Sequence, residues 1–441
     1  MRKLIATIVA KLIYFVGGLV GKGSSYPGKI ALKICPDILS QLKFPKVVIA
    51  ITGSNGKTST TEMVAAILKE AGKSVAYNDK GSNQIEGVTT TALHFATLGG
   101  VIKEDVLLLE SDERYAKFSF KYFHPTHYVI TNLYRDQLTR NGHPDWVYDA
   151  IEASIHGPEM LILNADDPLV SKFGAAKDNV RYFGLAHASI DEDSFNGAYN
   201  DGQYCPVCKS KMEYDYYHYN HIGAYHCTGC DFRRMDAKYE VTDVDLDAGY
   251  LTINNEDRIS LALKSIYNIY NILAAYSVCC EIGIDSKVIT KVLSDYVLKN
   301  GRFLRYKLGE HEGTFLVSKH ENSVSYDMSI KYAVADKDPH SVIIIVDAIS
   351  RKYFTSETSW LWDINFELLN DPCVTKIYLC GKYCHDLALR FEFTGINKER
   401  ITLYESIDEA CNFLKNEGQD KLYTITCFSD RMKFLSNVEV L

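Results

Sequence analysis

The chain has 441 residues, and its hydrophobic (46%) and charged (24%) fractions are those of an ordinary globular protein, which excludes long intrinsic disorder. The formal net charge of -8 argues against a nucleic-acid partner, because such binding needs a basic surface. At this length we expect two or three domains.

The first segment with structural meaning is apolar. Residues 4–20 are hydrophobic but are interrupted by Lys11. A membrane-spanning helix needs about 20 consecutive apolar residues, so we expect no span here. Two interpretations stay open: an amphipathic helix that packs on the main domain, or one that makes peripheral contact with a membrane surface.

A nucleotide-binding motif follows. Residues 46–52 form a β-branched run typical of a buried parallel strand, and they lead into a glycine-rich turn at 53–60 and a helical pattern at 62–71. Strand, turn and helix in this order predict a phosphate-binding P-loop, with Lys57 reaching the β- and γ-phosphates and Thr58 holding Mg²⁺. The strict GxxxxGK[ST] pattern is not met, because Ile51 stands at its first glycine. Because it lies on a surface loop, Lys57 is expected to contribute little to the core.

Three further apolar runs, at 105–109, 127–132 and 160–164, alternate with helical patterns. This alternation predicts an α/β fold with a mostly parallel sheet covered on both faces. The carboxylates Glu110, Asp112 and Glu113 follow the first run, at the carboxyl edge where such sheets bind ligands. Such a carboxylate is either a second Mg²⁺ ligand beside the P-loop or a solvated strand end.

Four cysteines show metal-ligand spacing. Two CxxC knuckles separated by eighteen residues are typical of a zinc ribbon, in which four thiolates close a tetrahedral structural site. They are Cys205, Cys208, Cys227 and Cys230. Two disulfides or a chance pattern are the alternatives. Cysteine usage in this chain favours a cytoplasmic protein.

The segment 52–58 resembles the TGxNGKT signature of the Mur ligases, the ATP-dependent amide-forming enzymes of cell-wall synthesis. Other family motifs follow in the family's order: Glu110, 132–136, 164–167, Tyr267–Asn268 with Asn271, and Gly301–Arg302. The cysteine knuckles, residues 26–33 and residues 359–367 resemble one branch, the MurT subunit of lipid II isoglutaminyl synthase.

The resemblance implies an architecture of three parts. An N-terminal segment (1–45) precedes a Mur-ligase-type central P-loop ATPase domain (46–300), into which the zinc ribbon is inserted at about 200–235. A smaller C-terminal α/β, Rossmann-like domain (301–441) follows and would bind a glutaminase.

The resemblance also implies roles for single residues. ATP phosphates would be bound by the loop residues Gly53, Asn55, Gly56, Lys57 and Thr58, and Mg²⁺ by Thr58 with Glu110. The remaining nucleotide contacts would come from Asp167, Asn268, Asn271 and Arg302, with Arg302 at the γ-phosphate. Many Mur ligases have a histidine for a second Mg²⁺ where this chain has Gln137, so the resemblance does not extend to that metal.

The implied reaction is amidation. ATP would phosphorylate the α-carboxyl of D-glutamate in the lipid II stem peptide, and ammonia from a GatD-like glutamine amidotransferase would displace phosphate to give D-isoglutamine. This places the enzyme in the cytoplasm at the inner face of the membrane, in a heterodimer. Two alternatives stay open: a Mur-like ligase that joins an amino acid or peptide to a cell-wall-type precursor, and a nucleotide-binding scaffold without catalysis.

The C-terminal third departs from the MurT pattern at 319–326 and 346–357. In the family an aspartate of this domain completes the partner's Cys–His pair. Asp347, at the end of the apolar run 341–346, is the first candidate and Glu357 the second. A strand-end carboxylate without a partner is the third interpretation.

Overall fold

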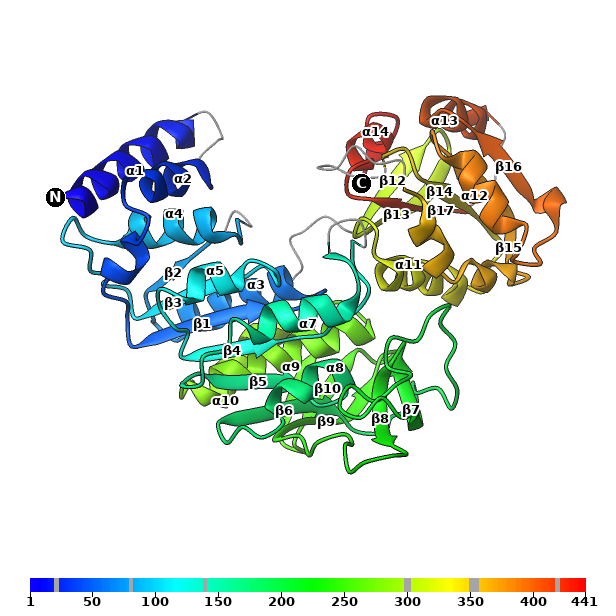
Figure 1. The fold of residues 1–441 in the computed structure, drawn as a ribbon. Coiled ribbons are helices and arrows are strands. Elements are labelled where there is room, and N and C mark those ends of the chain that lie inside the picture. Colours follow the sequence, from blue (N-terminus) through cyan, green and yellow to red (C-terminus); the bar gives the residue numbers. More distant parts are fainter. Residues whose placement is uncertain (20–23, 79–81, 138–140, 297–302, 349–356, 417–420) are drawn as a thin grey trace. The chain divides into compact units, whose positions relative to one another are not determined.

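The computed structural model describes residues 1–19, 24–78, 82–137, 141–296, 303–348, 357–416 and 421–441 (Figure 1). The chain divides into two compact units. Unit 1 comprises 1–133, 144–195 and 201–297, and unit 2 comprises 134–143, 196–200 and 298–441. The predicted boundary at residue 300 lies outside the described residues, and each unit is considered by itself.

Unit 1 begins with two helices, α1 (Arg2–Leu19) and α2 (Tyr26–Ile34), and the short η1 (Ile38–Gln41). Ala6, Ala10 and Ala31 are buried in the same hydrophobic cluster as the first strand of the sheet, so this segment packs on unit 1. Among the described residues, no helix is long and apolar enough to cross a membrane.

A nine-stranded sheet forms the centre of unit 1, in the order β11-β10-β9-β6-β5-β4-β1-β3-β2. The seven strands from β2 to β9 in this order run parallel. β10 pairs antiparallel with β9, and β11 pairs antiparallel with β10. The predicted strands are confirmed, and their near-continuous burial explains their apolar sequences. The strands are β1 (Val47–Thr52), β2 (Val75–Tyr77), β3 (Val106–Glu110), β4 (His127–Ile130), β5 (Met160–Asn164), β6 (Val180–Leu185), β9 (Tyr239–Asp245), β10 (Tyr250–Ile253) and β11 (Asp257–Ser260).

Helices cover both faces of this sheet (Figure 1). On one face α3, α9 and α10 pack against one another. On the other face, alternate strand residues share a core with α4, α5, α7 and α8. These helices are α3 (Lys57–Glu70), α4 (Ile85–Phe95), α5 (Ala116–Phe120), α7 (Pro144–Glu152), α8 (Pro168–Ser171) with η2 (Lys172–Gly174), α9 (Ile266–Glu281) and α10 (Ser286–Ser294).

The cysteine-bearing insertion in unit 1 is an antiparallel hairpin of β7 (Met212–Tyr219) and β8 (Ile222–Cys227). β8 is tied to the loop that follows β5. The Gly223 amide donates to the Asp166 carbonyl (3.0 Å), and the Tyr225 hydroxyl donates to the Ala165 carbonyl (3.0 Å).

Unit 2 contains a seven-stranded sheet in the order β16-β15-β14-β17-β13-β12-β18. The five strands from β16 to β13 in this order are parallel. β12 pairs antiparallel with β13, and β18 pairs antiparallel with β12. Hydrophobic clusters lie on both faces, which confirms the predicted α/β class. The strands are β12 (Phe303–Leu308), β13 (His311–Ser318), β14 (His340–Ile345), β15 (Val374–Cys380), β16 (Ile401–Tyr404), β17 (Lys421–Cys427) and β18 (Glu439–Val440). The helices are α11 (Ser323–Ala335), η3 (Ser359–Asp363), η4 (Phe366–Asn370), α12 (Cys384–Phe391), η5 (Lys398–Arg400), α13 (Ile407–Asn416) and α14 (Arg431–Leu435).

Candidate active site

The turn between β1 and α3 needs glycine at two positions. Gly53 has φ 134°, and a Cβ there would lie 2.2 Å from the Thr131 hydroxyl oxygen. Gly56 has φ 84°, and a Cβ there would lie 2.1 Å from Oδ1 of Asn271. Side chains from two other segments therefore press against a backbone that only glycine can form. Asn271 lies against the P-loop, although it is far from it in the sequence.

Two residues that follow β4, Thr131 and Asn132, hold the phosphate loop in place by hydrogen bonds. The Asn55 amide donates to Oδ1 of Asn132 (2.8 Å), and the Thr131 hydroxyl donates to the Asn55 carbonyl (2.8 Å). The helix α3 begins at Lys57 without a side-chain cap at Gly56. A helix N-terminus presented by a fixed loop is a phosphate-binding arrangement.

The carboxylate of Glu110 contacts the first turn of α3. The Thr58 hydroxyl donates to Oε2 of Glu110 (2.8 Å), and Asn83 donates to Oε1 of Glu110 (3.0 Å). Glu110 is buried at the end of β3, whose register places it beside Ile51 of β1. Hydroxyl and carboxylate oxygens together are the donor set that Mg²⁺ prefers, so these residues fit the ion.

Lys57 is less exposed than its loop position suggests. Its ammonium forms an ion pair with Glu113 and donates to the Gly53 carbonyl. The Lys57 and Glu113 side chains are 11% and 4% exposed. The expectation that Lys57 contributes little to the core is therefore wrong, because removing it would leave a buried carboxylate without this partner. The sequence predicted Glu113 as one of the carboxylates at this sheet edge, but not its ion pair with Lys57.

The remaining nucleotide candidates differ in their surroundings. Oδ1 of Asn268 is buried without a hydrogen-bond partner among the described residues, which leaves an acceptor for a ligand. Asp167 is fully buried; it caps α8 through the Leu169 and Val170 amides and accepts from the Leu133 amide (2.8 Å). Arg302 lies outside the described residues.

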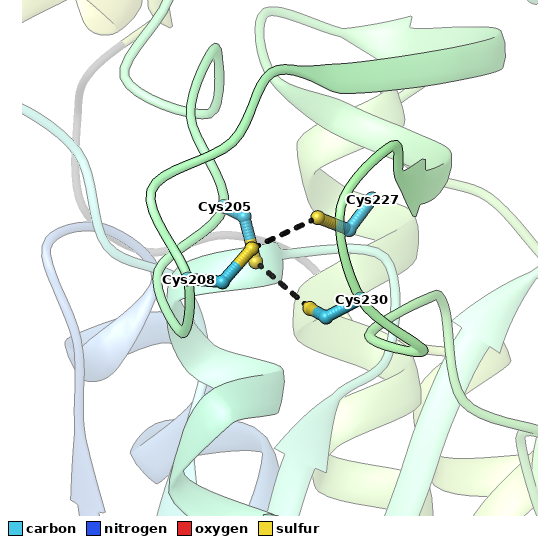
Figure 2. A group of neighbouring side chains, drawn as sticks. All are labelled: Cys205, Cys208, Cys227 and Cys230. Atoms are coloured by element: carbon cyan, nitrogen blue, oxygen red, sulfur yellow. Dashed lines mark hydrogen bonds between the residues drawn. The ribbon is translucent and has the colours of Figure 1, made fainter.

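The four predicted zinc ligands come together at one end of the hairpin (Figure 2). All four sulfur atoms lie within 4.8 Å of one another, with Cys205–Cys230 at 3.7 Å and Cys208–Cys227 at 3.3 Å. These separations are too long for disulfides and suit thiolates around one ion, for which tetrahedral Zn–S bonds of about 2.3 Å give sulfurs about 3.8 Å apart. Backbone amides of Val207 and Gly229 donate to the sulfurs of Cys205 and Cys227.

Asp347 lies two residues after the end of β14, at the carboxyl edge of the parallel sheet of unit 2. Its Oδ1 accepts from the Lys382 amide (3.0 Å), and its Oδ2 pairs with Lys433. Burial alone would raise the pKa of Asp347, but the hydrogen bond from Lys433 and the amide hold it below its ordinary value. The buried Asp430 accepts from the amides of Asp347 and Ala348 and so fixes the backbone at this position.

Glu357 has a different setting. It is exposed, and its carboxylate accepts from the Ser359 amide (2.7 Å) at the start of η3. Hydrogen bonding with the Ser359 side chain, and then with its amide, lowers the pKa of Glu357. Its contact is local, two residues along the chain, whereas Asp347 stands at the carboxyl edge of a parallel sheet.

Unit 2 contains a polar cluster that the sequence did not predict. Lys319 pairs with Asp136, and Asn322 donates to the other oxygen of Asp136 (3.0 Å). Gln137 (φ 49°) donates its amide to the carbonyl of Glu321 (φ 50°), so two non-glycine residues hold left-handed conformations across this contact. Both segments are polar in sequence, but the sequence does not indicate that Asp136 contacts Lys319 and Asn322.

Comparisons with known proteins agree with this geometry. A family model of the Mur ligase middle domain matches residues 51–279, and a model of the MurT ligase C-terminal domain matches residues 320–430. Lipid II isoglutaminyl synthase (glutamine-hydrolyzing) subunit MurT of Staphylococcus aureus (strain COL) is 32% identical over 90% of this chain and 89% of its own length. The subunit of the same name from Streptococcus pneumoniae (strain R6) is 29% identical over 98% and 96%.

Among solved structures, the pseudomurein peptide ligase type C of Methanothermus fervidus superposes with a TM-score of 0.72 at 21% identity, over 91% of this chain and 80% of that one. It shares the fold. The sheet, the phosphate loop and the carboxylate beside it define an ATP-dependent ligase of the Mur type, a class that uses ATP and Mg²⁺. Since the MurT relatives match along nearly their whole length, the chain belongs to the Mur ligase family and, within it, to the MurT branch.

Proposed function

We propose that the chain is the synthetase subunit of a lipid II isoglutaminyl synthase. It would convert the α-carboxyl of D-glutamate in the lipid II stem peptide to the amide of D-isoglutamine, with ATP and with ammonia from a GatD-like glutamine amidotransferase. The arrangement of Lys57, Thr58 and Glu110 at one sheet edge, in a chain with MurT-type similarity in both units, carries the proposal.

The residues of the loop would bind and orient the nucleotide. Lys57 and the amides at the start of α3 hold the phosphates, and Gly53 and Gly56 let the backbone approach them. Thr58 and Glu110 would hold Mg²⁺, which neutralises charge on the transferring phosphoryl group. Asn268 would offer its buried Oδ1 to the nucleotide, with Asn55, Asn271 and Asp167 as neighbouring contacts and Arg302 at the γ-phosphate.

The chemical sequence has two steps. A carboxylate oxygen of the acceptor attacks the γ-phosphorus of ATP, ADP leaves, and an acyl phosphate forms. Ammonia then attacks the acyl carbon and phosphate leaves, giving the amide. Fixed positive charge and amide donors accelerate the first step, because charge builds on the phosphoryl oxygens in the transition state.

Asp347 is the proposed contact with the amidotransferase. Its carboxylate would orient a catalytic histidine of that partner as the acid of a triad does. Within the chain the carboxylate is paired with Lys433, so this role requires the histidine to share or replace that contact. Because the acceptor is lipid-linked, the proposed place of action is the cytoplasm at the inner face of the membrane. Zinc in the cysteine cluster would be structural, since four thiolates leave no open position.

The proposal is tested with the purified chain, with and without the amidotransferase, on lipid II. We expect ATP-dependent amidation with ammonium from the chain alone, and with glutamine only when the partner is added. Asp347→Asn should keep the ammonium reaction and lower glutamine-dependent turnover by orders of magnitude, on the scale of the ~10⁴ found for a triad acid replaced by its amide.

Two results would redirect the proposal. If glutamine-dependent turnover survives in Asp347→Asn and collapses in Glu357→Gln, the second carboxylate has the partner role. If an amino acid or peptide is ligated in preference to ammonia, the chain is a Mur-like peptide ligase instead.

A further inference from the structure

Helix α1 exposes an unusually apolar side. Six large hydrophobic side chains on it, and Met1 directly before it, are solvent-exposed: Leu4, Ile5, Ile8, Leu12, Phe15 and Val16. At 100° per residue these positions fall within a sector of about 120°, and no charged residue lies in that sector. We call this sector the outer face of α1.

The inner side of the same helix is small and polar. Ala6, Thr7 and Ala10 are buried. The ammonium of Lys3 donates to the carbonyls of Gln41 (3.2 Å) and Gly99 (3.0 Å), and that of Lys11 donates to the His94 carbonyl (2.7 Å). An ordinary surface helix buries its large apolar residues and leaves lysines in water. Here two lysines attach the helix to the body, and the large residues are left outside.

The charged side chains of the first two helices all have the same sign. Residues 1–36 contain six basic and no acidic side chains, although the whole chain has a formal charge of -8. Arg2 is exposed on α1, and Lys29 and Lys33 are exposed on α2, which packs against α1. An apolar helix face in a basic setting is the pattern of a helix that lies in the interface of an anionic bilayer.

We propose that the outer face of α1 docks on an anionic lipid bilayer, with Leu12 and Phe15 among the acyl chains and Arg2, Lys29 and Lys33 at the headgroups. A second copy of the chain fits less well. Two such segments would bring like charges together, and one helix face of six residues is small against the 20–30 residues a side of a stable protein interface. The inference does not depend on the proposed amidation.

The test is co-sedimentation of the full chain with vesicles of equal parts phosphatidylglycerol and phosphatidylcholine. We expect wild type to bind, and to bind pure phosphatidylcholine several-fold more weakly. Leu12→Glu with Phe15→Glu should lower the partition coefficient by at least about tenfold, because two charges would enter the apolar layer. Trp146→Glu with Leu389→Glu is the matched control, since both side chains are more than half exposed elsewhere in the chain and add the same charge.

Lys29→Glu with Lys33→Glu should remove most of the preference for anionic vesicles. Unchanged melting temperatures in all variants would show that surface chemistry alone was altered. The proposal is overturned if wild type does not bind anionic vesicles, or if the control pair loses binding as fully as the α1 pair. It is also overturned if light scattering shows a dimer that the α1 pair dissociates while vesicle binding is unaffected.

Discussion

Lys57 and Glu113 show how the charge of a loop lysine is compensated inside the protein. Both side chains are nearly buried and pair with each other, so neither charge is left uncompensated. Phosphate oxygens offer the ammonium a competing partner of the same sign as Glu113. Binding of the nucleotide would therefore set the phosphates in competition with Glu113 for the ammonium of Lys57.

We expect Lys57→Ala to lower ATP-dependent turnover by at least about 100-fold, because the transition-state charge loses its nearest cation. The same change should reduce the free energy of unfolding by about 1–3 kcal/mol, since Glu113 stays buried without this partner. Adding Glu113→Gln should restore most of the stability and none of the activity. Urea unfolding and steady-state turnover measure the two effects; full activity in Lys57→Ala would contradict the ligase assignment.

Asp327 of α11 is a buried carboxyl, and its protonation makes the stability of unit 2 depend on pH. Burial raises its pKa from 3.8 to about 7, although the Asn365 amide (2.7 Å), Lys331 and Arg390 act in the opposite direction. The folded state therefore binds a proton that the unfolded state releases between about pH 4 and pH 7. As pH rises through this window the folded state loses stability.

For Asp327→Asn we expect this pH dependence to disappear. The variant should exceed wild type at pH 8 by up to about 4 kcal/mol in the free energy of unfolding, because 1.36 kcal/mol corresponds to each pKa unit. Asparagine keeps an oxygen that can accept from the Asn365 amide. Asp338→Asn, at a carboxylate that is 83% exposed, is the matched control. Urea titrations at pH 5 and pH 8 that give the same difference for both variants would refute the assignment.

Among the elements, the hairpin of β7 and β8 connects the cysteine cluster to the sheet. Gly223 and Tyr225 of β8 bond to the carbonyls of Asp166 and Ala165, in the loop after β5. His218 of β7, and Arg234, which follows β8 in the chain, lie close to the carboxylate of Asp166, the histidine at 3.8 Å. The hairpin thus supports a loop at the carboxyl edge of the central sheet, and the cysteine cluster lies at its other end.

Freshly purified protein should contain one zinc per chain. Cys208→Ser with Cys227→Ser should lose it and lower the melting temperature, because the structural ion contributes its binding energy to folding. Turnover per folded molecule should change by less than about tenfold, since no ligand position is open for chemistry. Cys373→Ser, outside the cluster, should retain metal and stability. Metal analysis that finds no zinc in wild type would contradict the ribbon.

At the scale of the whole molecule, the chain has two compact units with separate hydrophobic clusters. Multi-domain proteins of this kind do not unfold as one two-state system. The phosphate loop belongs to unit 1 alone. A nucleotide that binds there stabilises that unit directly, in proportion to the logarithm of its concentration.

We expect Mg²⁺ with a non-hydrolysable ATP analogue at 100 times its Kd to raise the free energy of opening by about 2.7 kcal/mol for peptides from β1 and β4. Peptides from β14 and β17 should change far less. Hydrogen exchange followed peptide by peptide measures this, with Lys57→Ala as the control that abolishes the shift. An equal gain of protection in both sheets would show that the two units open as one.

Local features were readable without a structure. The segment 46–71 contains its own strand, turn and helix signals, and each CxxC knuckle forms within four residues, so neighbouring side chains determine both. The strands ending at Glu110 and Asn164 were predicted for the same reason. The alternation of strands and helices indicated the α/β class, and the motif at 52–58 indicated the family.

Contacts between distant segments were decided only by the tertiary structure. Asn271 presses on Gly56 and Glu113 neutralises Lys57 because helices and strands far apart in sequence meet at one sheet edge. The apolar run interrupted by Lys11 indicated an amphipathic helix at α1 but not which side of it faces the body, since that depends on the small residues and carbonyls it meets there. Burial and pairing are properties of packed neighbours, and the order of residues along a chain does not specify them locally.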